Sequence, residues 1–320
     1  MNIKSNKRNL LKNISPLKLS VFIILILYSI TILGVLGWGI LTSFKSVLDF
    51  TDMRNLFGLP DSNLSVDEIR FGNYATVWKN FTLSVESYGY YSSIFGSITI
   101  GTYTANIVTM ILNTIIYAGL GSLIQTIVTM TMGYMCATYK NKISSIIYAV
   151  VLFSMTLHLV GGQPSEISMM MNLGLYNSYF GMFAHKFQFT GMYFLIFHAF
   201  FSGMASTYTE AAEIDGASQL RIYISIIMPL AAKMMGTIFL LLFIGYWNDY
   251  QTPLLYYPSF PTLAYGVFRM TSNTYGGTSL TQGTPQRIAG CVILFIPVII
   301  IFISFKDIVL GNVSMGGLKE

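Results

Sequence analysis

Charged residues are scarce in this chain: Asp, Glu, Lys and Arg together make up 10% of its 320 residues. Hydrophobic residues make up 53%, and the mean hydropathy is +0.61. A soluble enzyme needs a more strongly charged surface, so this balance argues against that class and indicates a membrane protein. The net charge of +5 comes from basic residues that do not gather in one patch, and we expect no nucleic-acid partner.

Cysteine is rarer still. The chain has two, Cys136 and Cys291, and they lie far apart in apolar runs. We expect each to pack as a small hydrophobic residue, without a disulfide or a bound metal. Paired carboxylates, Cys/His clusters and the HExxH and GxSxG motifs are missing at workable spacing, as is a G-x-x-x-x-G-K-[ST] phosphate loop. The sequence therefore predicts no catalytic site, no metal and no cofactor in this chain.

Long apolar runs that contain no charged residue, or in one case the single charge of Lys233, are in contrast abundant. A helix needs about 20 apolar residues to cross the hydrocarbon core of a bilayer, and only a helix satisfies its own backbone groups there. Six runs come near this length: Leu19–Phe44, Leu112–Tyr139, Ile143–Gln163, Phe189–Ser206, Ala231–Asn248 and Ile288–Phe305. The sequence thus predicts an all-α, polytopic membrane protein with six transmembrane helices.

Basic residues indicate how these helices are oriented. The N-terminal arm, 1–18, contains no acid, and its basic residues are Lys4, Lys7, Arg8, Lys12 and Lys18. The positive-inside rule places this arm in the cytoplasm. The C-terminal tail, 307–320, then returns to the same side, and the connection with Lys140 and Lys142 also lies inside. We expect a multi-pass membrane protein with both termini cytoplasmic.

The segment between the first two helices, 45–111, faces outward in this topology. It is rich in Ser, Thr, Asn, Gly and Tyr, with charges of both signs, and it is longer than an ordinary connection. One interpretation is a small folded element that meets an extracellular partner; the other is a partly ordered loop. The other five helices, within 112–306, form the main body of the chain.

The connection between the fourth and fifth helices, 207–230, is the most informative segment and lies in the cytoplasm in this topology. Its acids are Glu210, Glu213 and Asp215. Asp215-Gly216 can end a helix, because Gly takes a positive φ without steric cost, and apolar residues then recur at helical spacing up to Pro229. We expect a helix, a turn and a second helix that seat in another protein. The alternative, an amphipathic loop on the membrane, normally carries Lys and Arg.

This connection resembles the EAA loop of ABC importer permeases, in which Glu-Ala-Ala is followed by Gly and then by a hydrophobic-Pro pair. The matching residues are Glu210, Ala211, Ala212, Gly216 and Met228-Pro229. The fuller form, with Asp215 and Ala217, is similar to the carbohydrate branch represented by the inner subunit of maltose-type transporters. Trp247-Asn248-Asp249 also resembles a segment of this family, although Ala205, Tyr208 and Lys233 depart from its pattern.

The resemblance implies a permease core of type I in 112–306 and a subunit of an ATP-driven importer for a sugar or oligosaccharide in the bacterial plasma membrane. The partners implied are an ABC ATPase dimer that binds ATP-Mg, a second homologous permease subunit, an extracellular solute-binding protein and membrane lipid. In this resemblance Glu210 pairs with a basic residue of the ATPase, and Ala211, Ala212 and Ala217 allow the two proteins to approach closely. Gly216 makes the turn, and Pro229 ends the second helix, which acts as a lever.

Polar residues within the expected helices are candidates for the substrate pathway, although each is also explained by helix packing. They are Asn113, Gln125, His158, Trp247 and Asn248. Two other functions remain open. One is an ABC permease for another solute, such as a peptide or polyamine. The other is an ion-coupled secondary transporter, which would need buried ionisable residues or internal repeats, and the sequence indicates neither.

Overall fold

A computed structural model of the chain describes residues 16–51, 56–60, 72–87, 101–157, 161–204, 207–272 and 283–313. Its contacts divide the chain into two compact units, of which unit 1 comprises Met1–Lys79 and Leu280–Val292. Unit 2 comprises Asn80–Ser279 and Ile293–Glu320. Each unit has its own set of stabilising contacts.

Unit 1 is built on one long apolar helix, α2 (Pro16–Ser43), which is followed by α3 (Val47–Thr51) and α4 (Gly72–Asn80). The apolar window of α2 is not buried anywhere within the chain, as expected for a helix surrounded by lipid. The amide of Asn73 on α4 donates to the backbone carbonyls of Ser43 and Lys45, both at 2.8 Å. These bonds satisfy the last carbonyl of α2 and one carbonyl just after it, and they attach α4 to the end of α2.

Unit 2 begins with an antiparallel pair of strands, β1 (Thr82–Ser87) and β2 (Gly101–Asn106), in register from Thr82 opposite Asn106 to Ser87 opposite Gly101. Asn106 caps the next helix through its side chain. That helix is continuous through α5 (Ile107–Ile115), the π-helical η2 (Ile116–Leu120) and α6 (Gly121–Thr138). Segment 45–111 therefore holds folded elements of its own, although its residues 52–55, 61–71 and 88–100 lie outside the description.

The remaining elements of unit 2 are helical and are joined by short connections. They are α7 (Lys142–Thr156), α8 (Gly162–Asn172), α9 (Tyr179–Ala184), η3 (His185–Phe187), α10 (Met192–Ser202), α11 (Thr207–Ile214), α12 (Gln219–Ile222), η4 (Tyr223–Ile227), α13 (Met228–Leu230), α14 (Ala232–Trp247), α15 (Gln251–Tyr256) and α16 (Leu263–Thr271). The last helix, α17 (Thr284–Val313), begins in unit 1 and continues into unit 2.

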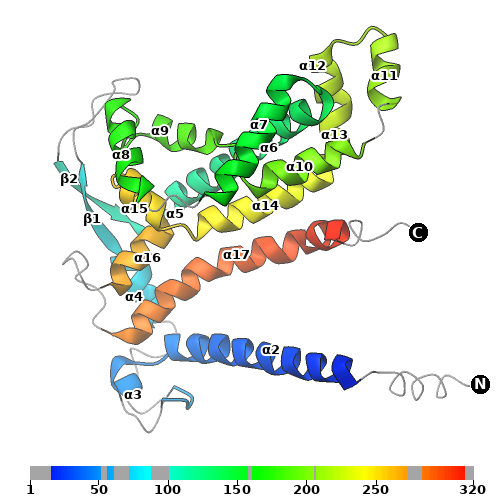
Figure 1. The fold of residues 1–320 in the computed structure, drawn as a ribbon. Helices are drawn as coiled ribbons and strands as arrows, with labels where there is room; N and C mark the ends of the chain where they lie inside the picture. Colours follow the sequence, from blue (N-terminus) through cyan, green and yellow to red (C-terminus); the bar gives the residue numbers. More distant parts are fainter. Residues whose placement is uncertain are drawn as a thin grey trace, which may run out of the picture. The chain divides into compact units, whose positions relative to one another are not determined.

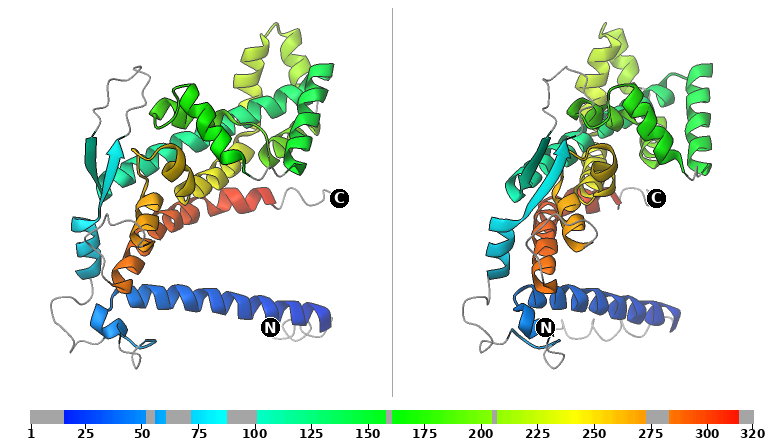
Figure 2. Two further views of the ribbon diagram at one scale, coloured as in Figure 1. Left: turned by 60° about the vertical axis from the view of Figure 1, so that its left-hand side comes forward. Right: turned by 90° about the vertical axis from the view of Figure 1, so that its left-hand side faces the viewer.

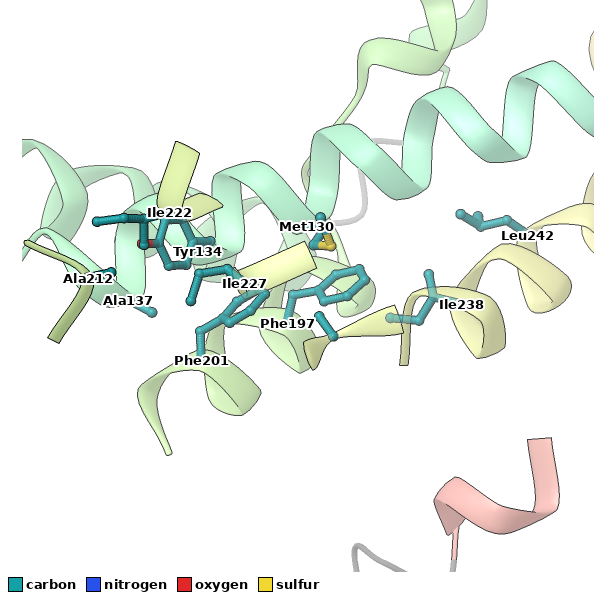
Figure 3. Close-up of a cluster of buried hydrophobic side chains, with 11 residues drawn as sticks. Met130, Tyr134, Ala137, Phe197, Phe201, Ala212, Ile222, Ile227, Ile238 and Leu242 are labelled. Carbon is teal, nitrogen blue, oxygen red and sulfur yellow. The ribbon is translucent and has the colours of Figure 1, made fainter. Parts of the chain in front are cut away.

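The core of unit 2 lies where α10 and α14 pack along α6 (Figure 1). One of its clusters joins Met130 and Tyr134 of α6 to Phe197 and Phe201 of α10 and to residues of the 207–230 connection (Figure 3). Gly133 makes this packing possible, because a Cβ at that position would lie 2.8 Å from the Cβ of Phe197. The pair α11 and α12 lies at one end of α6 and α14, and the β-hairpin with α15 lies at the opposite end (Figures 1 and 2).

An apolar helix is present at each of the six predicted positions, and the all-α, polytopic membrane fold is confirmed. Within the described residues, three helices are long and apolar enough to span a bilayer: α2, the helix Ile107–Thr138, and Thr284–Ser304 of α17. A fourth span results if Gln219–Leu230 and α14, which meet at a bend of 74°, are counted together.

Two of the expected helices are shorter than the uncharged runs that contain them. Helix α7 has 15 residues and α10 has 11, against the expected ranges Ile143–Gln163 and Phe189–Ser206. Leu157 leaves helical geometry with a ψ of 103° and so ends α7. Gly191, with a φ of 131°, precedes α10, and Gly203 follows it. The charged residues therefore mark the limits of each apolar run, whereas the backbone conformation at residues within the run sets the ends of the helix.

Candidate functional site

The turn between α11 and α12 is a Schellman motif centred on Gly216. The amide of Ala217 donates to Ala212 O and that of Gly216 to Glu213 O, each at 3.0 Å. Gly216 has a φ of +75°, a conformation that glycine adopts freely and other residues at a cost. The predicted helix, turn and second helix are therefore present, and Gly216 occupies the position that makes the turn.

The residues of the EAA pattern divide into an outer and an inner set. Glu210, Ala211, Asp215, Gly216 and Pro229 are exposed, and Ala217 is half-buried. Ala212 is 8% exposed and packs against the α6 and α12 side chains of the core cluster (Figure 3). Ala212 therefore seats α11 on its own chain, while Ala211 faces away from that cluster.

The second half of the connection ends where the sequence predicted, but it contains a widened turn that was not predicted. Ser218 caps α12 by accepting from the amide of Arg221, and the helix then widens into the π-helical η4, where Met228 N donates to Tyr223 O. Because Pro229 has no N–H, a wider turn before it accommodates the missing bond. The helix runs on to Leu230, and the bend of 74° follows at Ala231.

Polar side chains brace this connection against α6. Gln219 Nε2 donates to Glu213 Oε1 at 2.7 Å, and Tyr139 OH donates to Gln219 Oε1 at 3.0 Å. Further toward the N-terminus of α6, the hydroxyl of Thr131 lies 2.7 Å from that of Tyr223 in η4. Glu213 is thus engaged within the chain, which leaves Glu210 and Asp215 as the acids of the exposed face.

The predicted pathway residues do not come together in one place. Asn113 is buried, donates to Pro261 O at 3.1 Å and accepts from Tyr179 OH at 3.3 Å. Trp247 is 3% exposed, and its indole donates to Leu294 O at 3.0 Å. Asn248 is exposed and bonds to its own helix. Contact with a substrate remains a prediction for each, and His158 lies outside the described residues.

Gln125 belongs to a different environment, because it accepts a hydrogen bond from Tyr246 OH. Tyr246 in turn faces a buried cation: Lys186 Nζ lies 3.6 Å from the centre of its ring and 4.5 Å from that of Tyr117. Lys186 is 5% exposed. The expectation that the chain buries no ionisable group is therefore wrong.

Lys186 is part of a polar cluster that the sequence did not predict. We call it the His185–Lys186 cluster; it comprises Tyr117, Glu166, His185, Lys186, Asp249 and Tyr256. Lys186 donates to Tyr117 OH at 2.9 Å, and Tyr117 donates to Asp249 Oδ2 at 2.7 Å. The adjacent His185 pairs with Glu166 at 3.0 Å, and Tyr256 donates to Glu166 at 2.7 Å.

Burial governs the electrostatics of this cluster. Desolvation lowers the pKa of Lys186 to about 7, against the attraction of Asp249, which favours the charged form. Desolvation and the neighbouring Lys186 lower the pKa of His185, whereas Glu166 opposes that shift. Both cations are therefore held under conditions that favour their neutral forms.

The two cysteines differ in their surroundings. Cys136 is buried, as expected for a small hydrophobic residue, whereas Cys291 is exposed. Both are free thiols. No group of three or more His, Cys, Asp or Glu residues that could hold a metal is found within the described ranges.

Comparison with known proteins yields several relatives, although no family model matches the chain. The diacetylchitobiose uptake system permease protein NgcG of Streptomyces coelicolor is 25% identical over 92% of this chain and 87% of its own length. The arabinooligosaccharides transport system permease protein AraQ of Bacillus subtilis is 25% identical over 80% and 82%. The sn-glycerol-3-phosphate transport system permease protein UgpE of Escherichia coli K12 is 26% identical over 67% and 76%.

A solved structure extends this similarity to the fold. A bacterial ABC transporter involved in the import of the acidic polysaccharide alginate contains a chain that superposes with a TM-score of 0.68. The match covers 96% of this chain and 99% of the other at 19% identity. The resemblance to carbohydrate permeases of ABC importers, first indicated by residues 207–230, is confirmed by these relatives.

Proposed function

We propose that this chain forms one half of the membrane channel of an ABC importer and that its cargo is a sugar or oligosaccharide. The observation that carries the proposal is the exposed face of the 207–230 connection. On it, Glu210, Ala211, Asp215 and Gly216 are open to solvent on an element that is itself braced against α6. Small residues allow close approach of a partner, and the acids suit a groove lined by Arg or Lys.

The proposed partner on this face is an ABC ATPase, which binds ATP-Mg and closes as a dimer. Residues 207–230 are fixed to α14 through the bend at Ala231, so a pull on the connection would move the N-terminal end of α14. This chain then needs no catalytic residue of its own. A second, homologous permease subunit completes the channel, and an extracellular binding protein delivers the cargo.

The proposed topology follows from the charge of the terminal segments. With the basic N-terminal arm in the cytoplasm, residues 207–230 lie inside, where an ATPase is available. The β-hairpin and α15, at the opposite end of unit 2 (Figure 2), then face the outside, where the binding protein arrives. The C-terminus returns to the cytoplasm.

Carbohydrate is favoured as cargo because NgcG and AraQ, by their names, serve a diacetylchitobiose uptake system and an arabinooligosaccharide transport system. UgpE serves sn-glycerol-3-phosphate, so the cargo requires a direct test. Cells that express the chain with its partners are offered radiolabelled diacetylchitobiose, arabino-oligosaccharides and glycerol 3-phosphate, with a dipeptide and putrescine as controls. We expect uptake of one of the first two probes, lost on deletion of the gene.

The coupling role is tested in the same cells with Glu210→Lys. Charge reversal places like charges against the proposed basic groove, so we expect uptake to fall by at least about tenfold while the protein stays inserted. Lys140→Gln, a charge change at an exposed site outside the connection, is the control. Wild-type uptake by the Glu210→Lys variant would rule out the proposed contact.

A further inference from the structure

Helix η3 presents two consecutive basic residues that contact different elements. His185 pairs with Glu166 of α8 and is hydrogen-bonded to Tyr257, just after α15. Lys186 extends to Tyr117 of η2 and over the ring of Tyr246 on α14. This short helix therefore joins α8 and the end of α15 to the long helices of unit 2.

The ammonium of Lys186 is poorly compensated for its depth of burial. It is 5% exposed and donates one hydrogen bond, to a neutral phenol. Two aromatic rings add cation–π attraction, but within the described parts of the chain no carboxylate lies at ion-pair distance from Nζ. A buried cation without a direct counterion destabilises the arrangement that buries it.

Backbone packing fixes the stem of this side chain. Gly121 on α6 faces it, and a Cβ there would lie 3.5 Å from Lys186 Cγ and 3.6 Å from Cε. Both distances are those of ordinary van der Waals contact, so the stem of Lys186 lies close along the backbone of α6 at Gly121.

The partners of Lys186 also anchor α15. Asp249 accepts from Tyr117 through Oδ2 and from the amide of Thr252 through Oδ1, at 2.7 and 3.0 Å. It thus caps the beginning of α15 while it is tied to Lys186 through Tyr117. At the other end of α15, Tyr256 is tied to Glu166. Movement of η3 would loosen both ends of α15 together.

We propose that Lys186 controls an opening of this part of unit 2. In its charged form Lys186 favours separation of η3 from α14 and α15, because the ammonium then reaches water. In its neutral form it favours the arrangement seen here. The apolar stem against Gly121 and the phenol of Tyr117 suit a neutral amine, which needs no counterion. An anionic group that entered from outside would stabilise the separated form further.

The groups that face Lys186 allow its titration to be separated from others. They are Tyr117 of η2, Tyr246 of α14, Asp249 after α14 and His185 on η3 itself. Glu166 and Tyr257 lie beyond His185, and α9 contributes no charged residue. Burial lowers the pKa of His185, so its imidazole is already neutral between pH 7 and 9. Lys186 therefore dominates the titration over that range.

The direction of the pH effect follows from the pKa of Lys186, about 7 when buried and about 10.4 when hydrated. The separated form binds more protons between these values, so its population grows as the pH falls towards 7 and then levels off. We expect the opening equilibrium to increase by up to about tenfold for each pH unit between 9 and 7.

Hydrogen exchange of the full chain in lipid nanodiscs tests the proposal, with protection factors corrected for the intrinsic exchange rate at each pH. In the wild type we expect protection of η3 and α15 to decrease by at least about tenfold from pH 9 to pH 7. Lys186→Met, which keeps length without charge, should give high protection at both pH values. Lys186→Arg, which stays charged throughout, should give low protection at both.

Lys140→Met, at an exposed position, is the matched control and should reproduce the wild-type profile. The same pH dependence in Lys186→Met as in the wild type would overturn the proposal, as would unchanged protection in the wild type from pH 9 to pH 7. If a variant fails to insert, the wild-type series still decides the matter. The test involves no transport, so its outcome is independent of the proposed cargo and coupling.

Discussion

The two ends of unit 2 use polar residues in opposite ways. At the 207–230 end, Glu210 and Asp215 are exposed, and the helix that carries them rests on its own chain through small apolar contacts such as Ala212. At the α15 end, the charges of the His185–Lys186 cluster are drawn inward, and Lys186 is 5% exposed. The first arrangement suits contact with another protein, and the second suits a change of conformation within this chain.

Helix α14 connects the two ends. It begins directly after the bend at Ala231 and ends at Trp247, followed by Asn248 and by Asp249 of the His185–Lys186 cluster. A displacement of the 207–230 connection and a release of α15 therefore act on the same helix from opposite ends. Substitutions confined to one end test whether the two ends can be separated.

Gly181→Ala should disrupt the α15 end most severely. A Cβ at this position would lie 1.8 Å from Leu175 O, so the backbone must shift, at a cost on the order of 3 kcal/mol. The carbonyl of Gly181 also accepts from Tyr257 OH. We expect a lower unfolding temperature and weakened protection of α15. Gly119→Ala, with nothing within 4 Å, is the control; equal unfolding temperatures for the two variants would contradict the packing described.

Lys186→Met should have the opposite effect on stability. Removal of a buried charge with retention of the stem is expected to stabilise the fold by about 2 kcal/mol at pH 7. This gain should shrink as the pH rises from 7 towards 10, because the lowered pKa of Lys186 means that the wild type loses its penalty over that range. Thermal unfolding across pH measures both effects.

Uptake should distinguish a conformational role of Lys186 from a purely structural one. If the charged form drives separation of η3 and α15, Lys186→Met is more stable yet transports its probe more slowly, by about tenfold at pH 7. A purely structural lysine would instead lower stability and uptake together. Unchanged uptake in a stabilised variant would show that the opening is not used in transport.

Gly216→Val should damage the 207–230 end and leave the other end intact. A β-branched residue at a φ of +75° is strained by about 1–2 kcal/mol, so the turn deforms and coupling is lost. Gly216→Asn, which tolerates this conformation, should retain most uptake at the same site. Loss of uptake in both variants to the same extent would argue against turn geometry as the cause.

Gln219→Ala should have the smallest effect. It removes the link between Glu213 and Tyr139, and exposed hydrogen bonds of this kind contribute about 0.5 kcal/mol. We expect a small loss of exchange protection in α11 and little change in α15. A larger loss in α15 than in α11 would show that the two ends are not separable in this way.

Local signals explain why residues 207–230 were predictable. The Gly216 turn and the acidic helix each depend on a few neighbouring residues, and the structure contains both. The helix ends at Leu230, one residue after the Pro229 that was expected to end it, but the widened helix η4 that accommodates Pro229 was not predicted. No local sequence pattern indicates such a widened turn.

Long-range contacts explain why the His185–Lys186 cluster was missed. Tyr117 is separated from Lys186 by 69 positions and from Asp249 by 132, so only the packed fold brings them together. A lysine just before an apolar run also has the appearance of a headgroup anchor. One signal was present in the sequence. Asp249 belongs to a segment that resembles the permease family, and a carboxylate directly after an apolar helix needs a hydrogen-bond donor or a cation nearby.

The most direct test of the central claim, that residues 207–230 dock on an ATPase, compares two neighbouring positions. In a variant without Cys136 and Cys291, single cysteines replace Ala211, which is exposed, or Ala212, which is 8% exposed. The full chain is co-expressed with ATPases of the same cell and labelled with a maleimide that carries a benzophenone. After irradiation, which joins the benzophenone to a nearby C–H bond, the cross-linked partner is identified by mass spectrometry. We expect an ABC ATPase cross-linked to position 211 and little cross-linked product at position 212. Absence of cross-linking at both positions, in a protein that is inserted and transports its cargo, would contradict docking of residues 207–230 on an ATPase.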